Sequence, residues 1–315
     1  MRRGVRLGAS AAVAVFVAAA LSSCAQSVKI TAPRYALVYG IQAYQFDALK
    51  YTVYDARSMV SALQGGDANM IVHEREDAAV TKSQIQTDIL SLADVSSDST
   101  IVFYFSGHGV SNANVSSFGV TPTSAGPYIV PYDAVVPISG ITSATVNNLI
   151  TPSELESWLA QTGTKNVIVI LDCCYSGAFV GSSSSIDASP QDYSSMPSFS
   201  AFSTAISNFG SLLSANASAS GQKSPIVLSA SGSEESSYDG TTAMQHGVFT
   251  YYLLQAATNA ASDGVVTMTE AYAYTQKAIM TWGASLTNAD YQTYGYLPFL
   301  PHLSGGVRDL VLFTD

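Results

Sequence analysis

Four short, almost continuous apolar segments constrain the fold of this chain more than any other feature. They cover residues 35–39, 101–105, 167–171 and 226–228. Each is rich in β-branched or aromatic residues and has the length of a strand rather than of a helix. Strands that are apolar on both faces are typical of parallel sheets. We therefore expect an α/β fold with a mostly parallel central β-sheet.

Amphipathic patterns between these segments predict helices on both faces of that sheet. Ala56, Met59 and Leu63 are spaced so that they share one face of a helix. A Thr that is followed three residues later by Gln or Glu is a helix-start signal. This signal occurs at Thr81, Thr151 and Thr267. Strands and helices that alternate along a chain in this way form a layered α/β domain.

The charge balance argues against nucleic-acid binding. The chain of 315 residues has 13 Lys and Arg against 23 Asp and Glu, a net charge of −10 at pH 7. Binding to phosphates needs a basic surface, so no nucleic-acid partner is expected. The three cysteines are too few to form a disulfide framework.

The first 23 residues have the pattern of a signal peptide. Three arginines precede an apolar run over residues 11–21, which is shorter than a membrane-spanning helix. A Leu-Ser-Ser-Cys sequence then ends at Cys24 and resembles the lipobox of bacterial lipoproteins. The resemblance implies an exported protein anchored to a membrane through lipid on Cys24. Because Ala25 rather than Asp follows, the outer membrane of a Gram-negative cell is favoured; the alternative is a single-pass anchor.

Chemically active side chains follow two of the predicted strands. Segment 101–105 is followed by Ser-Gly-His-Gly, which contains His108, and segment 167–171 by Asp-Cys-Cys, which ends at Cys174. Either residue alone is more often structural than functional. Together they lie at the edge of an α/β sheet where ligands bind, and an imidazole beside a thiol favours the reactive thiolate. We expect a Cys–His nucleophile, with the flanking glycines leaving the His108 ring exposed.

The two blocks together resemble the catalytic blocks of metacaspases and bacterial orthocaspases, cysteine peptidases of the caspase family in the broad sense (family C14). The family patterns are Y-S-G-H-G and D-x-C-x-S-G. Residues 104–109 read Y-F-S-G-H-G, and residues 172–177 read D-C-C-Y-S-G. Segments 35–41, 54–59 and 229–253 agree in order and spacing. The resemblance implies the caspase-like fold.

It also implies a cysteine endopeptidase with a His/Cys dyad. By position His108 is the general base and Cys174 the nucleophile, while Cys173 fills the variable site of the pattern. The family's oxyanion donors are backbone amides, which correspond to those near Cys174 and at Gly109. Two alternatives stay open. One is a catalytically silent binding scaffold, and the other is a thiol acyltransferase that forms the same thioacyl intermediate.

The resemblance further implies protein or peptide substrates with Arg or Lys at the cleavage site. Metacaspases bind that basic side chain through acidic residues that correspond to Asp55 and Asp172, with Ser106 beside them. Two carboxylates suit one guanidinium, because a desolvated cation needs charge-assisted partners. The structural alternatives are a loop-capping role for Asp172 and a helix N-terminal role for Asp55.

No metal or other cofactor is predicted. Calcium-dependent metacaspases carry an acidic cluster after the His block, whereas residues 123–133 contain only Asp133. Calcium takes about six to eight oxygen ligands, so we expect no strong calcium dependence. The other histidines, His73, His246 and His302, lie in no sequence setting that indicates chemistry.

These segments divide the chain. We expect a signal peptide at 1–23, a lipidated tether at 24–33 and the peptidase domain at 34–315. Its expected parts are a large-subunit-like half at 34–180, a Ser-rich insertion at 181–224 and a small-subunit-like half at 225–315. The insertion has 16 serines and one basic residue, Lys223. An Arg/Lys-specific peptidase could cut itself at Lys223; the alternative is a surface lysine that is never cut.

Overall fold

The computed structural model describes most of the chain from residue 30 onward. The described ranges are 30–45, 48–67, 69–110, 128–134, 148–175, 225–230, 238–261, 263–287, 289–290, 301–304 and 310–314. The predicted signal peptide, the lipidation site Cys24, and the Ser-rich insertion with Lys223 lie outside these residues.

A central sheet runs through the molecule. Its strands are β1 Arg34–Gly40, β2 Met70–Glu76, β3 Thr100–Val110, β4 Tyr128–Ile129, β5 Asn166–Tyr175, β6 Ile226–Ser229 and β8 His302–Ser304. Their order is β2-β1-β3-β5-β6-β8, with β4 paired to β3. All pairs from β2 to β6 are parallel, whereas β8 and β4 pair antiparallel. The predicted mostly parallel sheet is confirmed.

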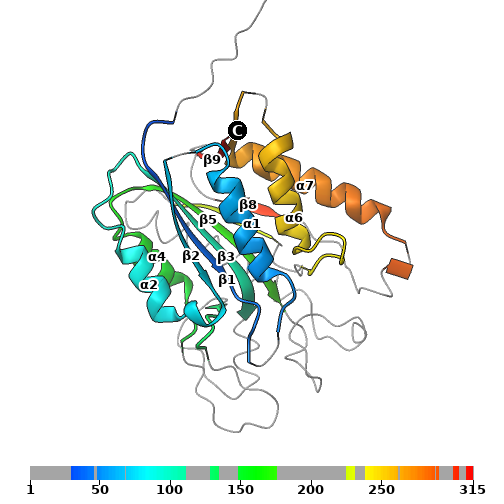
Figure 1. Ribbon diagram of the computed structural model, residues 1–315, viewed down its shortest axis with the longest axis horizontal. Coiled ribbons are helices and arrows are strands. Elements are labelled where there is room, and N and C mark those ends of the chain that lie inside the picture. The colour runs from blue at the N-terminus through cyan, green and yellow to red at the C-terminus, as the bar shows by residue number, and fades with distance from the viewer. Residues whose placement is uncertain are drawn as a thin grey trace, which may run out of the picture.

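Helices cover both faces of this sheet, as predicted. They are α1 Thr52–Gln64, α2 Lys82–Leu90, α4 Pro152–Leu159, α6 Val248–Asn259 and α7 Met268–Ser285, with a short 3₁₀ turn at Asp77–Ala79. Helices α2 and α4 lie on one side of the sheet, and α1, α6 and α7 lie on the other (Figure 1). Within the described part of the chain, every helix is too short or too polar to cross a membrane.

The strand side chains alternate between two apolar cores, one on each face of the sheet. Leu37 and Phe103 belong to the core beneath α2 and α4. Their neighbours Val38 and Tyr104 belong to the core beneath α1, α6 and α7. All four are fully buried. Burial on both faces explains why these strands appear in the sequence as continuous apolar segments.

The three predicted helix starts are confirmed, but one is incomplete. Thr151 and Thr267 each form a full capping box, in which the side chain and the backbone N–H of the N-cap both have a partner. Thr81 accepts a hydrogen bond from the Gln84 backbone at 3.1 Å. The Gln84 side chain does not return this bond, because it donates instead to buried Asp88 at 2.9 Å.

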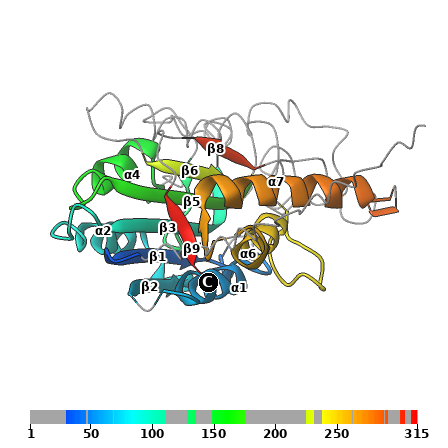
Figure 2. The same ribbon diagram turned by 90° about the horizontal axis from the view of Figure 1, so that it is seen from above.

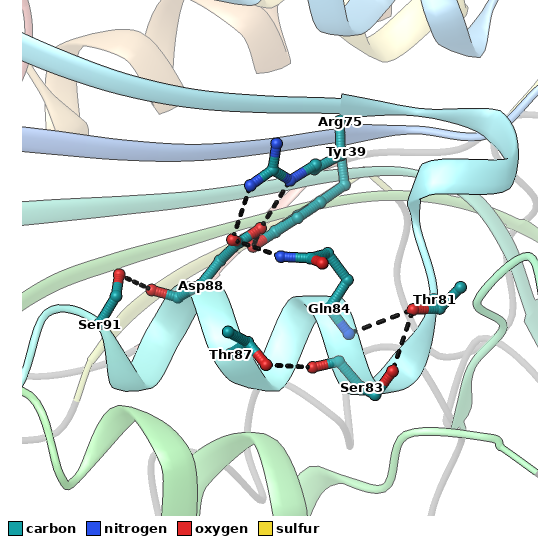
Figure 3. A network of polar contacts seen from close by, with 8 residues as sticks. All are labelled: Tyr39, Arg75, Thr81, Ser83, Gln84, Thr87, Asp88 and Ser91. Atoms are coloured by element: carbon teal, nitrogen blue, oxygen red, sulfur yellow. Dashed lines mark hydrogen bonds and ion pairs between the residues drawn. The ribbon is translucent and has the colours of Figure 1, made fainter.

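Asp88 joins helix α2 to the sheet through a buried polar network (Figure 3). Its carboxylate accepts two bonds from Arg75, at 3.0 and 3.1 Å, and one from the Tyr39 hydroxyl at 3.4 Å. Burial first, and then the Asp88 charge, raise the pKa of Tyr39 well above its usual value. The hydroxyl therefore stays protonated and donates. A buried carboxylate is stable only with such partners, so the network fixes α2 against β1 and β2.

We expect Asp88→Ala to lower the free energy of unfolding by about 2 kcal/mol, because it takes the acceptor away from the buried Tyr39 hydroxyl and from Arg75, whose side chain is 35% exposed. Urea unfolding measures the loss. The control is Asp94→Ala, since Asp94 is exposed close to the end of α2, and its effect should stay within about 0.5 kcal/mol. Equal urea midpoints for the Asp88 variant and the wild type would contradict this role.

The C-terminal strand is fastened to the start of the sheet. Strands β7 Val265–Thr267 and β9 Val311–Thr314 form a second, antiparallel sheet beside α7 (Figure 2). Arg34, at the start of β1, is buried and pairs with Asp67 at 3.0 Å. Its guanidinium also donates to the carbonyls of Val311 and Leu312, at 3.0 and 2.7 Å. The two ends of the described chain are thus held together.

Candidate active site

The two blocks singled out in the sequence lie opposite each other on β3 and β5. In the parallel register Ser106 is the Cα partner of Asp172, and His108 is the partner of Cys174. We expected both blocks to follow the ends of their strands; instead both strands continue through them. Pairing between the strands therefore holds their backbones. The backbone of Cys174 is described, whereas its side chain lies outside what the structure describes.

Cys173 is a core residue and not a nucleophile. It is a buried, free thiol in the apolar core beneath α2 and α4. Burial first, and then the neighbouring Asp172 charge, raise the pKa of this thiol well above its usual value. A thiol that stays protonated does not attack. Of the two neighbouring cysteines, only Cys174 remains as a candidate nucleophile.

His108 is fully buried, so the prediction of an exposed ring was wrong. The ring of Tyr44, in the segment after β1, packs against the imidazole with the ring centroids 4.5 Å apart. The Tyr44 hydroxyl accepts a bond from the His108 backbone N–H at 3.0 Å and donates to the Val130 carbonyl at 2.8 Å. A Cβ on Gly107 would lie 2.5 Å from that hydroxyl. The glycine therefore makes room for Tyr44, which no sequence pattern had indicated.

We expect Tyr44→Phe to lower the free energy of unfolding by about 2 kcal/mol, because it removes a hydroxyl that both accepts and donates inside the protein. The His108 imidazole signals should also shift in NMR spectra. Tyr54→Phe is the matched control, since Tyr54 is 48% exposed. The role of Tyr44 fails if both variants unfold at the wild-type urea concentration and leave the His108 signals unmoved.

Asp55 reaches the sheet because α1 begins unusually close to β1. A Cβ on Gly40 would lie 2.5 Å from the Thr52 carbonyl oxygen and 2.7 Å from the Ala56 Cβ. Only glycine permits this approach. Gly40 is in register with Ser106 of β3. The first turn of α1 therefore lies beside the His block.

The buried carboxylate of Asp55, only 1% exposed, has partners from three segments. The Ser106 hydroxyl donates to Oδ2 at 3.2 Å, which confirms that these two residues lie together. The His246 Nδ1 lies 2.9 Å from Oδ1. The Gly247 N–H donates to Oδ1 at 3.1 Å and to Oδ2 at 3.3 Å. The turn before α6 therefore folds back onto α1 and brings His246, which no sequence pattern had indicated, against Asp55.

Asp172 is 3% exposed and is held by a short relay of hydroxyls. The Thr250 hydroxyl donates to Oδ2 of Asp172 at 2.5 Å. A hydroxyl has one proton to donate, and Thr250 gives it to Asp172. Thr250 therefore accepts a hydrogen bond from the Tyr104 hydroxyl, whose oxygen lies 2.7 Å away. Burial first, and then the nearby carboxylates, raise the pKa of Tyr104 well above its usual value. Tyr104 therefore stays protonated and can donate.

Asp55 and Asp172, the acidic pair, converge on Gly247 at the N-terminus of α6. A Cβ on Gly247 would lie 3.0 Å from Oδ2 of Asp172 and 3.3 Å from Oδ2 of Asp55. The positive end of the helix thus faces both carboxylates. Burial most strongly, and repulsion from Asp172, raise the pKa of Asp55 to about 7, although its bonds to His246 and Gly247 oppose the rise. The sequence predicted Asp55 and Asp172 but not the contacts of Gly247 and Thr250. Gly247 and Thr250 nevertheless lie in segment 229–253, which agrees with the family pattern.

This raised pKa makes stability depend on pH. The folded chain keeps the Asp55 proton up to about pH 7, whereas an ordinary Asp releases it near 3.8. The stabilising contribution is therefore complete below about pH 4 and is lost as the pH rises through 7. We expect the free energy of unfolding, relative to Asp55→Asn, to fall by on the order of 4 kcal/mol over that range. Urea unfolding of both proteins measures it; a pH-independent difference would contradict the raised pKa.

The remaining predicted residues have clear positions. Gly109 lies within β3, in register with Tyr175 of β5 and with Ile129 of β4. The Asp133 carboxylate accepts the Lys82 backbone N–H at 2.9 Å, at the start of α2, and the Asn148 amide at 3.0 Å. In the described ranges no group of three or more His, Cys, Asp or Glu residues is arranged to hold a metal ion.

Comparisons with known proteins agree with this geometry. Residues 33–285 match the caspase domain of the Peptidase C14 family. Among solved structures, protein GSU0716 from Geobacter sulfurreducens is similar, with 17% identity and a TM-score of 0.51 over 88% of this chain and 95% of that one. Caspase-1 from Spodoptera frugiperda is also similar, with 10% identity and a TM-score of 0.52 over 93% and 95%. Identities this low show a shared fold. No curated protein matches the chain.

Proposed function

Since the chain belongs to the caspase-domain family of cysteine peptidases (C14), we propose that it is an endopeptidase whose His108/Cys174 dyad cleaves proteins after Arg or Lys. The observation that carries the proposal is the β3–β5 register. It makes His108 the Cα partner of Cys174, and Ser106 the partner of Asp172. The dyad and two of the three proposed specificity residues, Ser106 and Asp172, would thus share one pair of strands, while Asp55 comes from α1.

The dyad acts through a thioacyl intermediate. His108 takes the proton of Cys174, and the thiolate attacks the carbonyl carbon of the scissile peptide bond. The bond from carbon to nitrogen breaks, and the imidazolium gives its proton to the leaving amine. Water then attacks the thioester with His108 as base, which releases the acid and restores the thiol. Backbone amides near Cys174 and at Gly109 would stabilise the oxyanion.

The acidic pair supports a preference for Arg or Lys. The buried carboxylates of Asp55 and Asp172 both lie beside Gly247 and repel each other, and this repulsion contributes to the raised pKa of Asp55. A cation placed between them would relieve the repulsion and would form charge-assisted hydrogen bonds. An acidic substrate side chain would increase it. The same two residues therefore favour basic side chains and reject acidic ones.

Two parts of the proposal concern residues outside the described structure. We propose that Cys24 carries the lipid that tethers the enzyme to the membrane of a bacterial cell, after export. We also propose that the enzyme cuts its own chain after Lys223, in the Ser-rich insertion. Mass spectrometry of the active protein after incubation tests the second point, and an uncut Lys223–Ser224 bond would remove it.

The decisive experiment is a peptidase assay of the full-length chain on matched fluorogenic peptides ending in Arg, Lys or Asp. We expect cleavage after Arg and Lys only. Cys174→Ala should abolish it, and His108→Ala should lower kcat by about 10²- to 10⁴-fold. Asp172→Asn should raise KM for Arg peptides by about 10- to 100-fold, the value of a charge-assisted bond.

Cys173→Ala is the matched control, because it removes the neighbouring thiol from the core and leaves Cys174 in place. This variant should keep the wild-type kcat. Cleavage after Asp would overturn the assigned specificity. No cleavage by a folded protein with a titratable thiol would favour a binding scaffold, and transfer of the acyl group to added amines without hydrolysis would favour an acyltransferase.

A further inference from the structure

We propose that His246 competes with the substrate's basic side chain for Asp55, and so sets how tightly the acidic pair binds a cation. The proposal rests on the proposed function and concerns a histidine that neither the dyad nor the sequence motifs use. Its imidazole is the closest described partner of the Asp55 carboxylate, at 2.9 Å.

The described donors already reach all the acceptor positions of the Asp55 carboxylate. A carboxylate offers about four acceptor positions. His246 Nδ1 and the Gly247 N–H use Oδ1, while the Ser106 hydroxyl and the same N–H reach Oδ2. A guanidinium that binds Asp55 through two parallel bonds needs two of these positions. One of the present donors must therefore leave before such a side chain is bound.

His246 is the donor that can leave. The Gly247 N–H belongs to the backbone at the start of α6, and Ser106 is buried within β3. The His246 side chain is 18% exposed, so its ring reaches solvent. Its backbone is held in place, since its carbonyl accepts the Gly240 N–H at 2.8 Å. Rotation of the side chain would therefore free Asp55 without moving the helix.

Among the described donors to Asp55, His246 combines a side-chain N–H with access to solvent. Asp172 of β5 and the Tyr104 hydroxyl of β3, which reaches Asp172 through Thr250, also face this site. The imidazole N–H thus occupies an acceptor position that a substrate cation would need, beside two buried carboxylates whose charge is costly to leave unpaired.

The test measures binding of a small cation and peptide hydrolysis at a pH at least one unit above the Asp55 pKa of about 7. The full-length Cys174→Ala chain, with and without His246→Ala, is titrated with benzamidine, a planar cation that resembles the Arg side chain, by calorimetry. The same His246 substitution is placed in the active chain to obtain kcat and KM for Arg peptides. His246→Asn is a second variant, which keeps a neutral donor near the Nδ1 position.

We expect His246→Ala to lower both the Kd for benzamidine and the KM for Arg peptides about fivefold, the net value of one hydrogen bond, with kcat within about twofold. His246→Asn should give a smaller gain, because its amide N–H keeps a hydrogen bond to Asp55. His73→Ala, on edge strand β2, should change neither value.

Unchanged or weaker benzamidine binding in both His246 variants, with Arg peptides still cleaved, would overturn the competition. His246 would then be a residue that positions the Asp55 carboxylate. A fall in kcat at constant KM would overturn it as well. If no protein binds benzamidine or cleaves after Arg or Lys, the assigned specificity itself fails, and the competition fails with it. The first two results leave the proposed function standing, so the failures are distinguishable.

Discussion

The parallel pairing of β3 with β5 is the constraint on which the candidate active site depends. It fixes two residue pairs at once, Ser106 with Asp172 and His108 with Cys174. A slip of one residue would separate both pairs and would turn every apolar side chain of the strand toward the wrong core. The burial of both strand faces therefore specifies the register, and the register brings the chemistry together.

The second constraint is the cost of burying two carboxylates side by side. Asp55 is compensated by Ser106 of β3, by His246 and by the amide at the start of α6. Asp172 is compensated by a hydroxyl from α6. Because these partners come from separate parts of the chain, the acidic pair exists only once the whole domain has formed. Electrostatics thereby couples the site to the fold.

The sequence predicted what local pattern determines and missed what depends on distant contacts. Strands buried on both faces and helices with capping boxes leave a periodic signal, so the sheet and its covering helices could be predicted. The pairing of Asp55 with Ser106 could be predicted because family motifs mark both residues. Its bond to His246 spans 191 positions and leaves no periodic trace. The burial of His108 was missed for the same reason, since Tyr44 belongs to no motif.

The way the two halves interlock has a consequence for the integrity of the molecule. Strand β6, which follows the Ser-rich insertion, pairs with β5, which precedes it. Arg34, near the start of the described chain, donates hydrogen bonds to the carbonyls of Val311 and Leu312 near its end. Backbone continuity between β5 and β6 is therefore not what unites the domain. Two fragments produced by a break between β5 and β6 would share one sheet and one core. They would run as a single species under native conditions and would separate only in denaturant.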